Sequence, residues 1–303
     1  MPPKKPKKQL TKLPDENLKQ SAIEREAMLN RFGFIPVSIL KISRGRLSSQ
    51  MFNYQHESDN QRLLVRDPET GVMRSRPGNE FHYSSNRPTA SIMPAELVQY
   101  FIKYYALPGQ VYLDPFMGQG VQMQVAKVLG LDYYGYDCCE EYVRYIEGIV
   151  QRIDDGETVI KANLGDSRKP DKIPDGIGDF SFHSPPYWDI EYYDDSEAQL
   201  GYNQTYDDFL QGMEDVARAW MPKFKPGAFH VVNVNDFRRD GIFYPYHADT
   251  IKLFQRAGWQ MHDVWVIEGL VGGFPRMFAV NKNKTRIAPK IHEYALVFRK
   301  PEG

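Results

Sequence analysis

Strand-length apolar runs and helix-length amphipathic stretches alternate along the larger, C-terminal part of the chain. The pattern predicts strands at residues 111–114, 132–137, 157–162, 178–183, 228–235, 260–267 and 292–299. Helices are predicted at residues 94–105, 119–129, 140–152, 205–220 and 246–257. Such alternation favours an α/β fold, with a mainly parallel sheet that helices cover on both faces. No clear helix separates the last two strands.

The N-terminal part of the chain follows a different pattern. Residues 1–14 mix lysines with prolines and predict a disordered basic tail. Residues 15–31 predict an amphipathic helix, and residues 32–42 an apolar, strand-like segment. The sequence is then polar and irregular to about residue 86. We therefore expect a tail at 1–14, an N-terminal extension at 15–90 and a main domain at 91–303.

Charge is distributed unevenly along the chain. The formal net charge is −1, but five lysines among the first twelve residues leave −6 for the remainder. A general basic surface is therefore absent, and binding to a nucleic acid would depend on local cationic loops or on the tail. A tail that only aids solubility is an equal alternative.

The chain has no apolar run of the roughly 18 residues that a membrane span requires, and its lysine-rich start lacks the apolar stretch of a signal peptide. We therefore expect a cytoplasmic protein without a membrane contact. The two cysteines, Cys138 and Cys139, are neighbours with no histidine-rich cluster nearby. They predict reduced thiols, and no metal site is expected.

Three short motifs follow predicted strands. The first, Asp114–Gly120 (DPFMGQG), has glycines that let the backbone approach a ligand beside a helix N-terminus. An acidic residue before such a turn suits a ligand with an ammonium group. Asp137 ends the next strand, where a doubly wound fold places the acid that binds a ribose. The third, Ser184–Trp188 (SPPYW), is a rigid loop, because its two prolines fix φ and restrict the preceding serine.

In this order, the motifs resemble those of the S-adenosylmethionine-dependent amino-methyltransferases of DNA, which methylate N4 of cytosine or N6 of adenine. The resemblance covers roughly residues 90–300. It is closest to the methylases of phages and prophages, in which a segment like 32–40 also precedes the catalytic domain. It implies a Rossmann-like class I methyltransferase fold with a mainly parallel seven-stranded sheet, and the last two strands suit its antiparallel edge hairpin.

The resemblance implies a cofactor site for S-adenosylmethionine. Asp114 would accept the methionine ammonium, Asp137 would bind the ribose hydroxyls, and Asp166 would meet the adenine amine. Four further residues complete the expected site: Ser91, Phe116, Gly118 and Gly120.

The resemblance also implies how the target base is held. The Ser184 hydroxyl and the Pro185 carbonyl would accept hydrogen bonds from the exocyclic amine, which localises the lone pair of its nitrogen. Pro186 stiffens the loop, and Tyr187 would stack on a base that has been extruded from the duplex. Transfer would be direct, without a metal or a covalent adduct of the base. Serine at the first motif position favours cytosine N4, since adenine enzymes more often carry aspartate there, although the serine form also occurs among them.

One loop is the best candidate for contact with DNA. From residue 275 to residue 290 it carries basic residues and no acidic one. We expect contacts with the phosphates from Arg276, Lys282, Lys284 and Arg286, with a plain mobile basic loop as an equal alternative.

Other functions stay open at this point. Methylation of RNA or of a protein side chain is one alternative, and a non-catalytic nucleic-acid-binding protein with the same fold is another. The intact motifs speak against the second of these. A homodimer, a nuclease partner in a restriction-modification system and the recognition sequence are not readable from the chain.

Overall fold

The computed structural model describes residues 15–32, 38–41, 64–66, 73–75, 93–188, 196–202, 205–268 and 291–302. It divides the chain into two compact units, Met1–Val37 and Ser38–Gly303. In the first unit the described residues form helix α1 (Asp15–Phe32), at the place where the sequence predicts a helix. The basic tail at 1–14 lies outside the described residues. The sheet and the candidate site belong to the second unit.

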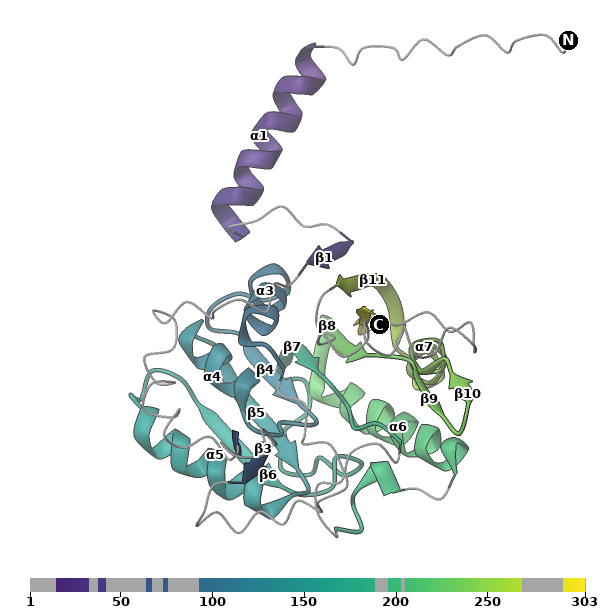
Figure 1. The fold of residues 1–303 in the computed structure, drawn as a ribbon. Helices are drawn as coiled ribbons and strands as arrows, with labels where there is room; N and C mark the ends of the chain where they lie inside the picture. The colour runs from purple at the N-terminus through teal and green to yellow at the C-terminus, as the bar shows by residue number, and fades with distance from the viewer. Residues whose placement is uncertain are drawn as a thin grey trace, which may run out of the picture. The chain divides into compact units, whose positions relative to one another are not determined.

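The described strands of the second unit build an eight-stranded sheet in the order β1-β11-β12-β8-β7-β4-β5-β6 (Figure 1). Its parallel core consists of β4 (Val111–Asp114), β5 (Asp132–Asp137), β6 (Ile160–Leu164), β7 (Gly178–His183) and β8 (Phe224–Val234). Strand β12 (His292–Arg299) runs antiparallel to both of its neighbours, β8 and β11 (Gln260–Glu268). This arrangement confirms the predicted fold, including the antiparallel edge hairpin.

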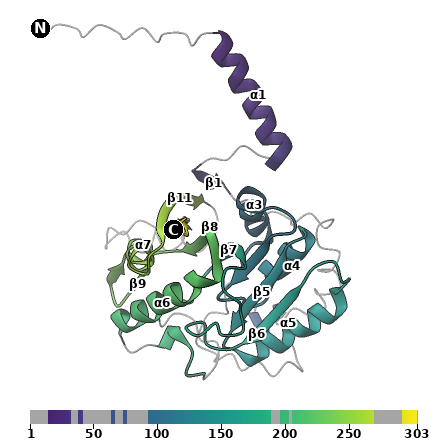
Figure 2. The same ribbon diagram turned by 180° about the vertical axis from the view of Figure 1, so that it is seen from behind.

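Helices pack on both faces of the sheet (Figures 1 and 2). On one face α3 (Ala95–Tyr105), α4 (Val121–Val128) and α5 (Glu140–Ile153) contribute to one hydrophobic cluster. On the other face α6 (Tyr206–Trp220) and α7 (Tyr246–Arg256) contribute to a second cluster. Consecutive residues of β4 divide between the two, since Tyr112 belongs to the first cluster and Leu113 to the second. None of the described helices is long and apolar enough to cross a bilayer.

Helix α5 shows how local sequence produces these layers. Its buried residues recur every three or four positions and therefore form one apolar stripe. They are Tyr142, Val143, Ile146, Ile149 and Ile153. Helix α6 starts at a capping residue, Thr205, whose hydroxyl oxygen accepts a hydrogen bond from the backbone N–H of Asp208 (3.1 Å).

The eighth strand lies within the strand-like segment that the sequence predicts at residues 32–42. Strand β1 (Ile39–Lys41) comes from the N-terminal extension and pairs in parallel with β11, with Leu40 opposite Ile267. The side chain of Leu40 is buried. The pairing supplies backbone partners to a strand that would otherwise be the sheet edge. The sequence predicts the strand-like segment but not its place in the sheet, so the sheet has eight strands where seven are predicted.

Four further short strands form two hairpins that the sequence does not predict. One hairpin joins β2 (Leu64–Arg66) to β3 (Met73–Ser75), and the other joins β9 (Phe237–Arg239) to β10 (Ile242–Tyr244). Two short 3₁₀ turns, η2 (Leu200–Tyr202) and η3 (Met221–Lys223), flank α6.

Candidate active site

A cavity of about 640 Å³ lies at the edge of the sheet where the parallel strands end. Because β12 is antiparallel to them, its first residues reach the same edge. One part of the wall includes Phe116, Gly118, Asp137 and Asp166 from the loops after β4, β5 and β6, and we call it the cofactor wall because the resemblance assigns these residues to the cofactor. The other part, the target wall, includes residues 184–187 after β7, Asn233, Asn235 and Asp236 at the end of β8, and Glu293 of β12. One cavity therefore joins all three motifs that the sequence singles out.

The glycine turn after β4 needs its glycines for conformation. Gly118 has φ 48° and Gly120 has φ 75°, in the left-handed region that glycine adopts at little cost. At Gly120 an added Cβ would also stand 3.0 Å from Cγ1 of Ile146 in α5. Gly118 lies on the cavity wall, whereas Gly120 directly precedes α4 and is not among the lining residues.

Asp137 connects the first two loops. Its Oδ2 accepts a hydrogen bond from the backbone N–H of Gly118, and its Oδ1 accepts one from Cys139; both distances are 2.9 Å. Asp137 also lies on the cavity wall, as does its neighbour Cys138. The carboxylate therefore fixes the glycine turn while one side of the residue faces the cavity.

Asp114 occupies a different place from the one that the resemblance implies. Its carboxylate is fully buried and is not part of the cavity wall. Oδ1 accepts from the backbone N–H of Phe116 (3.0 Å), and Oδ2 accepts from the hydroxyl of Tyr133 (2.8 Å). Burial raises the pKa of Asp114 to about 7, an effect that these two hydrogen bonds oppose. The geometry gives Asp114 the task of holding the turn from beneath.

Asp166 is held by an ion pair. The Nε of Arg168 lies 3.0 Å from Oδ1 and 2.9 Å from Oδ2 of Asp166, and an Nη2–Oδ2 contact measures 2.8 Å. The backbone N–H of Arg168 also donates to Oδ1 (2.8 Å). The next residue, Ser167, is buried, and its hydroxyl donates to the carbonyl of Pro115. The third loop is therefore fixed both within itself and to the first loop.

The motif at 184–187 directly follows β7, and all four of its residues line the cavity. The hydroxyl of Tyr187 accepts a hydrogen bond from the backbone N–H of Asn235 (2.8 Å). The ring of Tyr187 packs edge-on against Tyr246 and Phe237. The end of β8 and the start of α7 therefore fix the orientation of this tyrosine.

Two buried histidines lie behind the motif. The Nε2 atoms of His183 and His230 are 2.7 Å apart, so one ring donates its N–H to the other. Burial lowers the pKa of His183 to about 3, and burial with the neighbouring His183 also lowers the pKa of His230. Both rings are therefore neutral at ordinary pH, and Ser184 follows a strand end without charge.

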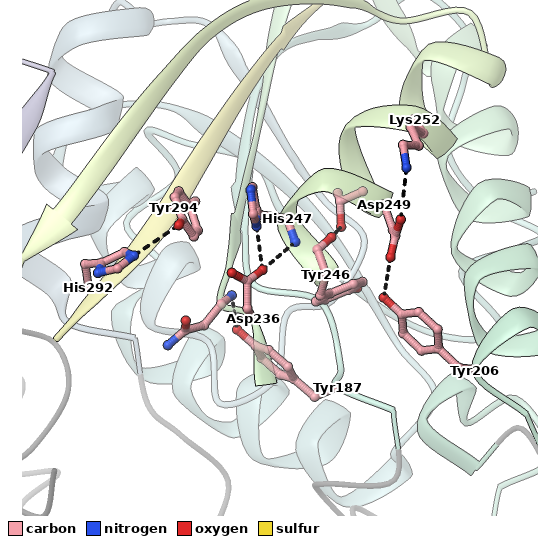
Figure 3. Close-up of polar contacts among 11 residues, drawn as sticks. Tyr187, Tyr206, Asp236, Tyr246, His247, Asp249, Lys252, His292 and Tyr294 are labelled. Atoms are coloured by element: carbon pink, nitrogen blue, oxygen red, sulfur yellow. Dashed lines mark hydrogen bonds and ion pairs between the residues drawn. The ribbon is translucent and has the colours of Figure 1, made fainter. Parts of the chain in front are cut away.

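A polar network continues from the target wall into α7 and β12 (Figure 3). Asp236 is buried, and its Oδ1 lies 2.5 Å from Nδ1 of His247 and accepts from the backbone N–H of the same residue (3.1 Å). The ring of His247 stacks on that of Tyr294, with 4.3 Å between centroids, and the Tyr294 hydroxyl lies 3.0 Å from Nε2 of His292. The network anchors α7 to the sheet beside the cavity.

Sequence reasoning missed the polar residues at the end of β8. Asn233 and Asp236 are buried, and the Asn233 side chain donates from Nδ2 to Oε2 of Glu293 (2.7 Å). A local signal exists, since polar residues interrupt an otherwise apolar strand immediately before it ends. The sequence does not show which residue these polar side chains contact, because the partner of Asn233 is Glu293, which lies far along the chain.

Five of the predicted site residues lie outside the described residues. They are Ser91 and the four cationic residues expected to contact DNA, Arg276, Lys282, Lys284 and Arg286. Their roles stay predictions.

Several solved structures resemble the described fold. TrmN from Thermus thermophilus is 19% identical with a TM-score of 0.45, over 68% of this chain and 48% of TrmN. A SAM-dependent methyltransferase from Methanosarcina mazei is 14% identical with a TM-score of 0.46, over 67% of this chain and 98% of its own. A candidate DNA modification methylase, also from Thermus thermophilus, is 23% identical with a TM-score of 0.36, over 46% of this chain and 52% of its own. This chain spans about half the length of TrmN. Likeness of this degree carries no information on the reaction.

The amino-acid sequence gives the more specific comparison. Among curated proteins, none matches this chain significantly. A family model of DNA methylases, the N6/N4 methyltransferases, matches residues 4–148 and 179–303. The matched ranges contain the glycine turn, Asp137 and the motif at 184–187, and thus most of both cavity walls. The resemblance to the amino-methyltransferases of DNA is confirmed, whereas the comparisons do not test the likeness to phage enzymes; the chain belongs to the DNA methylase family of N6/N4 methyltransferases.

Proposed function

We propose that this protein transfers the methyl group of S-adenosylmethionine to the exocyclic amine of a base in DNA, with N4 of cytosine as the acceptor. One observation carries the proposal: the cofactor wall and the motif at 184–187 enclose the same cavity. A methyl donor at the cofactor wall and an extruded base at the target wall would meet inside this cavity. Family membership supports both the donor and the class of substrate.

The cofactor wall fits S-adenosylmethionine, whose sulfonium supplies an electrophilic methyl group. Carboxylates stand at the ends of β5 and β6, where Asp137 would bind the ribose hydroxyls and Asp166 would meet the adenine amine. The turn at Gly118 lets the backbone come close to the ligand. Asp114 supports the site indirectly, because it is fully buried and is not among the residues that line the cavity. A cavity of about 640 Å³ is within the usual range for small-ligand sites.

The target wall supplies groups that suit an amine. Ser184 offers a hydroxyl oxygen and Pro185 a carbonyl oxygen, and both residues line the cavity. Acceptors for the two amine protons draw the nitrogen lone pair out of conjugation with the ring and so make the nitrogen a better nucleophile. The ring of Tyr187, fixed by Asn235, would stack on the base and partly offset the cost of unstacking it from the duplex.

The choice of cytosine rests on Ser184. Serine is the residue that the resemblance associates with cytosine N4, whereas aspartate is commoner where adenine N6 is methylated. Adenine would use the same walls and the same chemistry, so the identity of the target base is the most specific part of the proposal. Contact with the DNA backbone through the loop at 275–290 is part of the same proposal.

The test is transfer of labelled methyl groups from S-adenosylmethionine to four acceptors: duplex DNA, single-stranded DNA, RNA and a protein mixture. We expect label in DNA. Label confined to RNA or to protein would overturn the proposal, and so would the absence of label from all four when binding of S-adenosylmethionine is intact.

A further inference from the structure

Asn233 has a fixed orientation and an unused acceptor. A carboxylate can only accept hydrogen bonds, so the side-chain atom of Asn233 that lies 2.7 Å from Oε2 of Glu293 is the NH₂ group. The other side-chain atom is therefore the carbonyl oxygen, and among the described residues it has no hydrogen-bond partner. Asn233 is 4% exposed, and a buried acceptor without a partner is destabilising. Such an atom calls for a partner that binds during function.

The sheet places this acceptor next to the motif. Strands β7 and β8 are parallel, and His183 pairs with Val232. The residues that follow, Ser184 just beyond the end of β7 and Asn233 one residue before the end of β8, therefore lie at the same level, where strands are about 4.8 Å apart. Both residues line the cavity. Glu293 reaches the same place because its neighbour Tyr294 pairs with Val234.

A serine hydroxyl that accepts a hydrogen bond from an amine must itself be oriented. Its hydroxyl is both a donor and an acceptor, so it presents its lone pairs to the amine only when its hydrogen points to another acceptor. Asn233 offers that acceptor across one strand spacing. Hydrogen bonds of this kind are often long before the substrate binds and tighten in the complex.

We propose that Asn233, locked by Glu293, is a positioning residue that accepts the hydroxyl hydrogen of Ser184 when the target base is bound and so turns the serine lone pairs toward the exocyclic amine. The inference rests on the proposed function and adds to it two residues, Asn233 and Glu293, that orient the hydroxyl of Ser184. Glu293 acts by keeping the NH₂ group of Asn233 away from Ser184.

The experiment measures methyl transfer to duplex DNA by wild type, Asn233→Ala, Ser184→Ala and the double variant. Asn233→Ala should lower kcat by about ten- to a hundredfold, which corresponds to the loss of one hydrogen bond made to a buried group. The double variant should be no slower than Ser184→Ala alone, because Asn233 acts only through the serine. Binding of S-adenosylmethionine should be unchanged.

Two further variants separate this role from a structural one. In N233D/E293Q the acid and the amide exchange places, so an acceptor beside Ser184 and the hydrogen bond between the two residues are both kept. This variant should recover most of the activity that Asn233→Ala loses, whereas N233D alone sets two carboxylates in contact and should be poorly active. Asn163→Ala is the matched control, since Asn163 donates to the carbonyl of Gly135 on β5 and is not among the cavity-lining residues.

Three results would overturn the inference while wild type still methylates DNA. Asn233→Ala could match Asn163→Ala in kcat, the double variant could lose the product of the two single effects, or N233D/E293Q could be no better than Asn233→Ala. Should Asn233→Ala prove unfolded, the comparison of N233D/E293Q with N233D decides alone. A wild type without any transfer to DNA is a different result, which defeats the proposed function itself.

Discussion

The backbone N–H of Gly118 donates to Oδ2 of Asp137 at 2.9 Å. This bond joins the turn after β4 to the end of β5, two loops that form part of the cofactor wall. The same carboxylate that would bind the ribose therefore also shapes the turn beside it. Loss of the Asp137 side chain should weaken the site in two ways, because it removes the contact with the ribose and also the hydrogen bond that holds the turn at Gly118.

Asp137→Ala should accordingly weaken binding of S-adenosylmethionine by at least a hundredfold, since bonds to a charged acceptor contribute about 1.5–3 kcal/mol each. Calorimetric titration of the variant measures the change. Asp132→Ala is the control: Asp132 starts the same strand and accepts a backbone N–H from Val159 (2.8 Å), but it is not among the cavity-lining residues. Equal affinities of the two variants would show that Asp137 has no special role.

Asp114 makes stability depend on pH in a defined direction. Its pKa is raised from 3.8 to about 7, so between these values the folded protein holds a proton that the unfolded chain has lost. The contribution of this group to stability is therefore full below pH 4 and is lost as the pH rises through about 7. Asp114→Asn removes the titrating group with little change in shape.

The measurement is the free energy of unfolding of wild type and Asp114→Asn between about pH 4 and pH 8. The difference between the two proteins isolates Asp114 from His183 and His230, whose lowered pKa values act in the opposite direction and are present in both. We expect wild type to lose stability relative to the variant as the pH rises through about 7. A constant difference would contradict a raised pKa.

Arg168 should matter through Asp166. Removal of the guanidinium releases a carboxylate of the cofactor wall from its ion pair, so Arg168→Ala should weaken binding of S-adenosylmethionine by about tenfold. Arg144→Ala should have no effect, because the Arg144–Glu140 pair lies exposed on α5. Unchanged affinity in Arg168→Ala would contradict the role of this ion pair in holding Asp166 for the ligand.

The sequence predicts the parallel core well because its signals are local. Apolar runs and turn residues mark β4, β5, β7 and β12 with the bounds that the structure has. The motifs at Gly118 and Ser184 depend on glycine and proline, whose conformational effects act within a few residues.

Other features escape because they depend on residues far apart in the chain. Asp114 is buried and accepts a hydrogen bond from Tyr133, a partner that no pattern around the turn reveals. The partner of Asn233 is Glu293, which approaches only when β8 and β12 pair. The segment of strand β1 is predicted as strand-like, but its place in the sheet depends on its pairing with β11.

Identification of the methylated nucleoside tests the central claim most directly. The protein is incubated with S-adenosylmethionine and unmodified duplex DNA, the DNA is digested, and the nucleosides are resolved by mass spectrometry. Ser184→Ala is compared with Ser181→Ala, which removes a buried hydroxyl from β7 that lacks a hydrogen-bond partner among the described residues.

We predict N4-methylcytosine from wild type and from Ser181→Ala, and roughly a hundredfold less from Ser184→Ala with its affinity for S-adenosylmethionine retained. N6-methyladenine would keep DNA as the substrate and overturn the choice of cytosine. No methylated base from wild type, or equal yields from the two serine variants, would contradict amine methylation in this cavity.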